Sequence, residues 1–169
     1  MNTNAITKIL ALFFTGLLAG TFYYATANVL PTFGEVPDSI HLIFRTALMK
    51  HNSINMQLLM ALSIATGAWL AWQVRHSRVV FYLAVSASLL ALTSLLVTRL
   101  GSVPINMQIK TWDAGHPPQA WQNTLSRWNL FHSIRTYTSI ASFFCTIVVC
   151  QVKTTFSQIA PGQIRSAIQ

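Results

Sequence analysis

The sequence predicts an all-α protein, a four-helix transmembrane bundle with an extramembrane loop cap. Its composition is the first reason: 53% of the residues are hydrophobic and 8% are charged, whereas soluble domains carry about 25% charged residues. The second reason is four apolar runs without an acidic residue, each close to the roughly 20 residues with which a helix crosses a bilayer. The third is a long connection rich in Trp and Pro, which we expect to cover one end of the bundle.

The predicted helices cover residues 9–30, 54–74, 79–98 and 131–152, with loops at 31–53 and 99–130, in one membrane domain over 1–169. The first run has an alternative, because Lys8 and the Ala25-Thr26-Ala27 stretch resemble a signal peptide with its cleavage site. The run is longer than the apolar region of about 7–15 residues in such peptides. Gly16 and Gly20 also form a GxxxG pair that suits helix packing, so we expect a retained membrane helix.

The distribution of charge predicts the orientation. The turn Arg75-His76-Ser77-Arg78 and the tail with Lys153 and Arg165 contain basic but no acidic residues, and all three acids (Glu35, Asp38, Asp113) lie in the two long loops. By the positive-inside rule, the turn and both termini face the cytoplasm. We therefore expect a multi-pass protein of the cell inner or plasma membrane, with the long loops outside.

The net charge of +8 does not indicate a nucleic-acid-binding protein. The basic residues are scattered near the ends of the apolar runs rather than clustered on a soluble face. The partner that the composition indicates is membrane lipid; we also expect a lipophilic small molecule as a partner, on the hypotheses for function given below, and the oligomeric state stays open. Cys145 and Cys150 are about 140° apart around a helix axis, so they cannot form a disulfide with each other.

The loops are too long to be simple connectors. The first contains Ile40 to Lys50, which can form a short interfacial helix, and the second contains Trp112, Trp121 and Trp128. Tryptophan favours the membrane interface, so we expect this second loop to lie over the outer mouth of the bundle. In the third helix, the small residues Ala87, Ala91, Ser94 and Thr98 predict a helix contact.

The most informative stretch is a polar face at the start of the last helix. Trp128, His132, Arg135 and Ser139 are spaced four, three and four apart, so they share one helix face. Arg135 near a helix N-terminus opposes the helix dipole and needs an anionic partner or ligand. His132 can exchange a proton near neutral pH. The pair suits a phenolate or enolate; the alternative is that Arg135 extends to the interface and His132 bonds a loop carbonyl.

Other candidate ligands carry weaker signals. Asn106, after a proline turn, either orients a substrate carbonyl or caps the following helical turn, and we favour the cap. His41, His51 and His132 fall on the predicted outer side and together could bind copper, iron or zinc. Because no HxxxH-type spacing links them, we assign no metal site and leave the cofactor open.

Two stretches resemble a known family. They are Val103-Pro104-Ile105-Asn106-Met107-Gln108-Ile109-Lys110-Thr111-Trp112 and, after Trp121, Arg127-Trp128-Asn129-Leu130-Phe131-His132-Ser133-Ile134-Arg135-Thr136. Together they resemble the anthrone oxygenase-like membrane proteins, whose bacterial members mostly carry a domain of unknown function. The resemblance implies an oxygenase acting on a flat, oily phenolic substrate. It carries over Asn106, Trp128, His132 and Arg135 as matched positions without roles.

We weigh two hypotheses for function. In the first, the protein is an oxygenase that oxidises a lipophilic phenolic substrate with O₂; His132 is the base, Arg135 stabilises the oxyanion, Trp112 and Trp128 stack on the substrate and Asn106 contacts it. In the second, it is a non-catalytic membrane protein, a partner subunit or small-ligand binder, in which the same residues fix the cap to the bundle.

Overall fold

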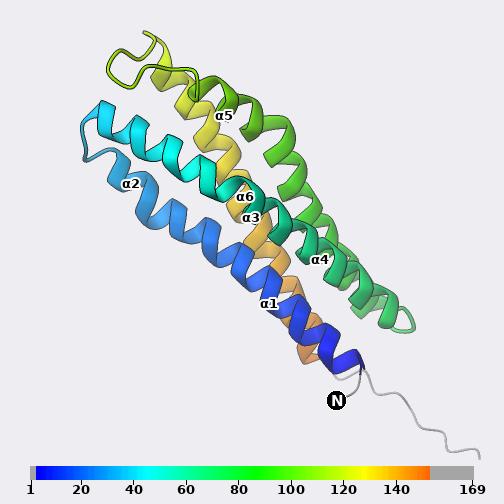
Figure 1. The fold of residues 1–169 in the computed structure, drawn as a ribbon. Helices are drawn as coiled ribbons and strands as arrows, with labels where there is room; N and C mark the ends of the chain where they lie inside the picture. The colour runs from blue at the N-terminus through cyan, green and yellow to red at the C-terminus, as the bar shows by residue number, and fades with distance from the viewer. Residues whose placement is uncertain (1–2, 153–169) are drawn as a thin grey trace, which may run out of the picture.

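Four long helices form an elongated bundle (Figure 1). The structure, a computed structural model, describes residues 3–152, and within them every element is helical. The elements are α1 (Thr3–Tyr24), η1 (Ala25–Val29), α2 (Leu30–Phe33), α3 (Asp38–Gln73), α4 (Arg78–Val97), η2 (Thr98–Ser102), α5 (Val103–Ile109) and α6 (Trp121–Gln151). The predicted all-α bundle is confirmed. The tail with Lys153 and Arg165 lies outside the described residues.

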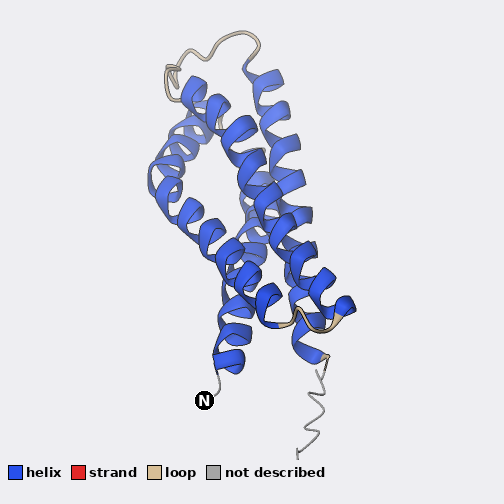
Figure 2. Cartoon of the chain, turned by 90° about the vertical axis from the view of Figure 1, so that its right-hand side faces the viewer, coloured by secondary structure: helices blue, strands red, loops and turns tan. Residues whose placement is uncertain are grey.

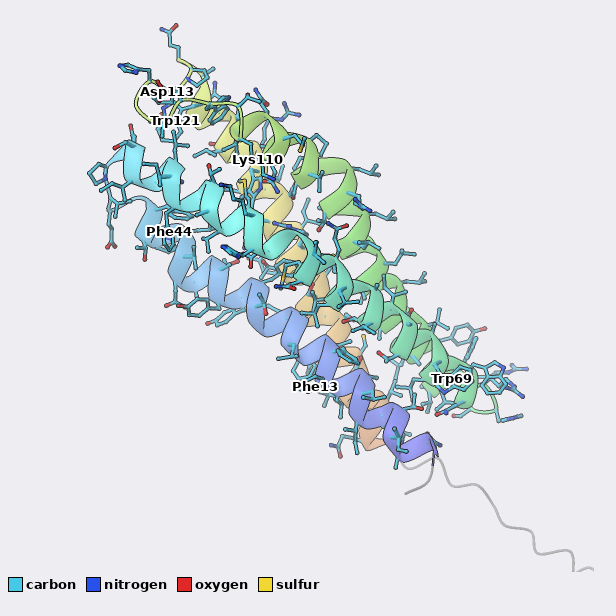
Figure 3. The ribbon with its side chains drawn as sticks, in the orientation of Figure 1. Phe13, Phe44, Trp69, Lys110, Asp113 and Trp121 are labelled. Carbon is cyan, nitrogen blue, oxygen red and sulfur yellow. The ribbon has the colours of Figure 1, made fainter. Side chains whose placement is uncertain are left out.

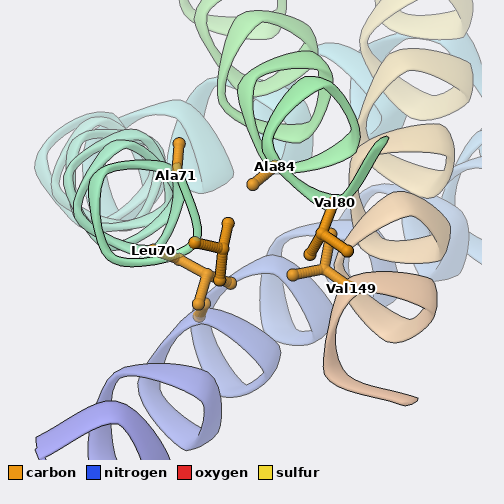
Figure 4. Packing of buried hydrophobic residues seen from close by; sticks show 7 residues of the cluster. Leu70, Ala71, Val80, Ala84 and Val149 are labelled. Carbon is orange, nitrogen blue, oxygen red and sulfur yellow. The ribbon is translucent and has the colours of Figure 1, made fainter. Parts of the chain in front are cut away.

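Each helix packs against two neighbours in the order α1, α3, α4, α6 and back to α1. The α3–α4 turn, the start of α1 and the end of α6 lie at one end of the bundle (Figure 1). A cluster of buried small and branched side chains fills this end (Figure 4): Ala11, Leu70, Ala71, Val80, Ala84 and Val149. Such small side chains let the helix backbones approach closely.

The predicted small-residue stripe of α4 is a helix contact, because Ala87, Ala91, Ser94 and Thr98 are all buried. The Ser94 hydroxyl lies 3.0 Å from that of Ser139 on α6. One turn of α6 further on, Ser142 donates to the Ala87 carbonyl at 2.7 Å. Short hydroxyl side chains thus bond across the α4–α6 interface, as they do between membrane helices.

The outside of the bundle is apolar. Phe13 and Trp69 lie on it, away from the neighbouring helices (Figure 3), and both are about half exposed. Four helical stretches are long and apolar enough to cross a membrane: Asn4–Phe33, Ile54–Gln73, Arg78–Ile109 and Trp121–Gln151. Because a water-soluble bundle would not expose so many large apolar side chains, the protein is a multi-pass membrane protein.

The helices extend beyond the predicted ends, which corrects the predicted loops. Most of 31–53 belongs to α2 and α3, and most of 99–130 to η2, α5 and α6. The connections left outside the helices, 34–37, 74–77 and 110–120, are short (Figure 2). Apolar runs locate the part of a helix inside the hydrocarbon core, whereas backbone hydrogen bonding continues through polar sequence beyond it.

Two prolines explain the two π-helical segments. Proline has no N–H, and its ring clashes with the carbonyl four residues earlier. For Pro31 that carbonyl belongs to Ala27 in η1, and for Pro104 to Leu100 in η2. The helix widens there into hydrogen bonds five residues long, from Leu30 to Ala25 and from Val103 to Thr98. π-Helical segments are rare in proteins, and those that occur often lie at functional sites.

Candidate functional site

One face of α6 carries His132, Arg135 and Ser139 into the interior of the bundle. Their side chains are 2%, 6% and 0% exposed, and Trp128 on the same face is half-buried. The predicted common face is therefore confirmed. The alternative in which Arg135 extends to the interface is wrong, since its guanidinium lies inside the bundle.

The imidazole of His132 has a partner for each ring nitrogen. The Nη2 of Arg135, which can only donate, lies 2.9 Å from Nδ1. The neutral ring then carries its proton on Nε2, 3.1 Å from the Thr26 hydroxyl oxygen. Thr26 can accept this hydrogen bond while donating to the Phe22 carbonyl at 3.0 Å. These contacts fix both the tautomer and the orientation of His132.

Arg135 is held by hydroxyl and aromatic groups. Its Nη1 donates to Thr98 at 3.4 Å, and Thr98 in turn donates to the Ser94 carbonyl at 2.8 Å. The guanidinium carbon lies 5.0 Å from the centre of the Phe22 ring, a cation–π contact. Its Nε is buried and has no acceptor. Thr26 comes from η1 and Thr98 from η2, so each proline-induced π segment supplies a hydroxyl to the His132–Arg135 pair.

Asn106 positions Trp128. The indole Nε1–H donates to the Asn106 side-chain oxygen at 2.7 Å, and the indole stacks on His132 with 5.1 Å between ring centres and 7° between planes. Asn106 lies inside α5, whose first turn follows Ser102. The interpretation of Asn106 as a helix cap is therefore wrong.

A second histidine–arginine pair lies on α3, in the Ile40–Lys50 stretch that we expected to form a short interfacial helix within the loop 31–53 and that is part of one long helix instead. The Nε of Arg45 donates to His41 Nε2 at 3.0 Å, and the two side chains are 4% and 8% exposed. The Phe33 ring stacks on His41 at 4.4 Å and 11°, and the Arg45 guanidinium lies 5.0 Å from the same ring. The signal in the sequence is the spacing of four, which places His41 and Arg45 on one face of a helix.

The surroundings of this second pair determine its protonation. Burial and, to a smaller extent, the positive charge of Arg45 lower the pKa of His41, Asp38 opposes them, and the resulting pKa is about 4. Burial also lowers the pKa of Arg45 to about 10. At neutral pH, His41 is therefore a neutral imidazole beside a charged guanidinium.

Trp128 joins the two pairs. The guanidinium of Arg45 lies 4.6 Å from the Trp128 ring centre and that of Arg135 lies 5.3 Å from it. Neither guanidinium has a carboxylate partner among residues 3–152. The acid–base contact found within these residues joins Asp113 to His116 and involves neither arginine. Two buried cations thus share one indole without a compensating acid, and an anion is the partner that they lack.

A cavity of about 360 Å³ opens beside the second pair. Its lining comes from α2, the α2–α3 connection and the first turns of α3 and α6: Leu30, Phe33, Gly34, Val36, Asp38, His41, Arg45, Trp121, Gln122, Leu125, Ser126 and Asn129. Trp121 lies at this end of the bundle, near the 110–120 connection (Figure 3). The cavity is within the size range of small-molecule sites.

Comparison with known proteins gives one match. The family model described as anthrone oxygenase matches residues 44–145, more than half of the chain. The chain belongs to the anthrone oxygenase family. The resemblance that the sequence suggested is therefore confirmed. No curated protein and no solved structure matches the chain.

In this anthrone oxygenase family member, the matched region contains Asn106, Trp128, His132 and the two buried arginines, Arg45 and Arg135. His41 and Thr26, which contact them, lie before the matched region. The centre of the cluster thus lies inside the matched region, whereas part of its surroundings comes from residues before it.

Other predicted site residues lie apart from this cluster. Trp112 packs, half-buried, against the apolar cluster of Leu42, Met49, Ile105, Ile109 and Leu125. Asp113, the one acid in the predicted loop 99–130, is exposed and contacts His116 rather than Arg135. Hydrogen bonds from the Gly115 N–H and from His116 lower the pKa of Asp113. Within residues 3–152, no three His, Cys, Asp or Glu side chains are grouped as metal ligands.

Proposed function

We propose that this member of the anthrone oxygenase family is a membrane-embedded oxygenase that oxidises a lipophilic phenolic substrate with O₂. One observation carries the proposal. Two guanidiniums, of Arg45 and Arg135, are buried against Trp128 without a carboxylate. Phenolic substrates become anions when they lose a proton, and a buried cation stabilises that anion more strongly than it stabilises the neutral molecule.

In this reaction, the main contribution required of the protein is proton transfer. An anthrone has an acidic CH₂ flanked by aromatic rings. Loss of one proton gives a carbanion that transfers an electron to O₂, and the resulting radical and superoxide combine into a peroxide. Protonation of the peroxide, loss of the second C–H proton and cleavage of the O–O bond leave a carbonyl and water. The balance is CH₂ + O₂ → C=O + H₂O, so the substrate supplies all the electrons.

His132 and Arg135 divide this work. The unpartnered Nε of Arg135 donates to the substrate oxygen, whose charge increases as the carbanion forms. A substrate oxygen that takes the Arg135 donors releases Nδ1 of His132, 2.9 Å away, to accept the proton. Asn106 acts through Trp128, whose ring it holds against His132. Trp112 contributes to the apolar packing at the same end of the bundle.

The substrate reaches this site from the lipid or from the outer face. By the positive-inside rule, the basic Arg75–Arg78 turn supports a cytoplasmic location for the opposite end of the bundle. Both termini are then cytoplasmic and the cavity faces outward, in an inner or plasma membrane.

One observation favours the second candidate, a non-catalytic ligand binder. Both ring nitrogens of His132 already have partners, Arg135 and Thr26. A histidine so constrained suits a ligand-binding scaffold whose arginines hold an anion without chemistry.

The substitutions Arg135→Lys and His132→Phe distinguish the two functions. Lys keeps the charge but loses the planar fork of donors, and Phe keeps a planar ring without a proton carrier. An oxygenase should lose about 10²–10⁴-fold in turnover of a phenolic panel that includes anthrones, when equal amounts of folded protein are compared in detergent. Variants that melt early but turn over substrate normally when folded would contradict the catalytic role. An inactive wild type that still binds the panel would establish the binder.

A further inference from the structure

We propose that the cavity between α3 and the start of α6 binds a planar aromatic anion, with Arg45 as the residue that holds its charge. The proposal deepens the proposed function and depends on it for the phenolic character of the ligand. Neither Arg45 nor the cavity was predicted from the sequence.

The face of α3 that lines the cavity changes from acidic to basic with depth. Asp38, His41 and Arg45 are spaced three and four apart and all line the cavity. Asp38 is exposed in the first turn of α3, whereas His41 and Arg45 are buried. A carboxylate at the rim is surrounded by water, so it does not neutralise a guanidinium two turns deeper.

Arg45 lacks an acceptor inside the cavity. Its Nε is used by His41, and its Nη1 is buried without a hydrogen-bond partner. Leaving a buried donor of a charged group unpaired is costly, and an oxygen anion on a bound ligand removes that cost. The Arg45 side chain is 4% exposed, so a ligand must enter the cavity to reach it.

The walls of the cavity combine aromatic rings with a larger share of polar surface. Phe33 and Trp121 provide rings, and Leu30 and Leu125 provide aliphatic surface. Gln122, Ser126 and Asn129 of α6 add hydrogen-bonding groups on one side. A phosphate headgroup could use the polar groups but would leave the rings without a partner, whereas a flat aromatic anion can pack on the rings and still meet Arg45.

Trp128 lies between Arg45, at the cavity, and the inner pair His132–Arg135. Arg45 lies over Trp128, and Trp128 stacks on His132. A ligand oxygen on Arg45 is therefore separated from the His132–Arg135 pair by one indole ring. This arrangement lets the cavity select the ionised ligand beside the residues that the proposed reaction uses.

The test uses a monohydroxyanthraquinone, whose phenolate absorbs at longer wavelength than its phenol and which does not need to react. It is titrated with the purified full chain in detergent, and absorbance is followed against pH. A cation beside the phenol should lower its apparent pKa by about 1–3. Arg45→Met should abolish this shift and weaken binding at least about tenfold. Lys50→Met removes an exposed cation from the same helix and should leave both unchanged.

A second pair of variants tests the location without touching the arginine. Ser126→Trp fills the cavity from an exposed α6 position, and Asn123→Trp adds the same ring to an exposed α6 position outside the lining. Only Ser126→Trp should block the probe. If Arg45→Met does not fold, these two tryptophan variants still test whether the probe binds in the cavity.

The outcomes separate the proposal from the proposed function. Probe binding with the shifted pKa supports the site even if no substrate is turned over. An unshifted pKa, equal binding by Arg45→Met or Ser126→Trp and wild type, or displacement of the probe by micellar phosphatidylglycerol but not by phosphatidylcholine would overturn it. The last result would identify a lipid-headgroup site.

Discussion

Two guanidiniums in the interior are expensive for the fold. Removing an ion from water costs several kcal/mol even after relaxation, and Arg45 and Arg135 are both almost fully buried. Cation–π contacts with Phe22, Phe33 and Trp128 return about 0.5–2 kcal/mol each. What remains is a stability cost of the kind that functional sites retain.

The hydrogen bond between Trp128 and Asn106 gives a prediction at this scale. Asn106→Leu leaves the indole N–H, 2.7 Å from its present acceptor, without a partner. We expect a loss of about 1–3 kcal/mol of stability, measured as a lower melting temperature in detergent. The loss should be smaller when Trp128→Phe is already present, since Phe has no N–H. Equal losses in both backgrounds, or an equal loss in the exposed control Asn123→Leu, would contradict this role.

The buried His41 predicts a dependence of stability on pH. Its pKa is about 4 in the folded chain and about 6.5 in an unfolded one. Between these values the unfolded chain binds a proton that the folded chain does not, so the free energy of unfolding falls as the pH falls. The melting temperature should decrease from pH 6.5 to 4.5, and His41→Phe should flatten that decrease. Parallel profiles for the wild type and the variant would exclude His41 as its source.

The sequence could indicate one histidine–arginine pair and not the other. His132 and Arg135 lie in an apolar run that can only be a helix, so their spacing of three implied a common face. His41 and Arg45 have an equally suitable spacing, but their segment lies outside the apolar runs and was expected to form at most a short interfacial helix, so the pair was not recognised. The contact of both arginines with Trp128 depends on the packing of α3 and α6, which spacing along one helix does not contain.

At the scale of elements, the positions of the two prolines indicate local helix distortions that the hydropathy pattern does not predict. Pro31 and Pro104 each follow an apolar helix and were assigned to loops. Their effect is instead to widen the helix into η1 and η2, which turns Thr26 and Thr98 toward His132 and Arg135. Helix count and approximate spans followed from apolar length, whereas helix ends and these local distortions did not.

Gly101 lets the η2 backbone lie close to α6. This close packing predicts that an added methyl group at residue 101 destabilises the protein. A Cβ at Gly101 would lie 2.7 Å from the Phe131 ring, whereas one at Gly20 would meet nothing within 4 Å. Gly101→Ala should therefore destabilise the protein by about 1–3 kcal/mol, and Gly20→Ala should not. Melting temperatures in detergent compare the two variants. Equal melting temperatures would mean that η2 and α6 do not pack as closely as the structure has them.

At the scale of the whole molecule, the two ends of the bundle differ. The end with the α3–α4 turn is closed by Leu70, Val80 and Val149. The other end holds the cavity, the two histidine–arginine pairs and both π segments. A bundle with one closed and one open end binds its ligand from a single side of the membrane, so the orientation decides where the ligand comes from.

Cysteine labelling tests that orientation. In a chain with Cys145 and Cys150 replaced by alanine, Ser77→Cys lies in the α3–α4 turn and Gln119→Cys in the 110–120 connection at the opposite end (Figure 1). A membrane-impermeant maleimide applied to intact cells should label Gln119→Cys and leave Ser77→Cys unlabelled until the membrane is opened. The reason is that Arg75 and Arg78 flank the turn without an acid and are retained in the cytoplasm. The reverse labelling would place the cavity on the cytoplasmic side, and its ligand would then have to be made or imported before it binds.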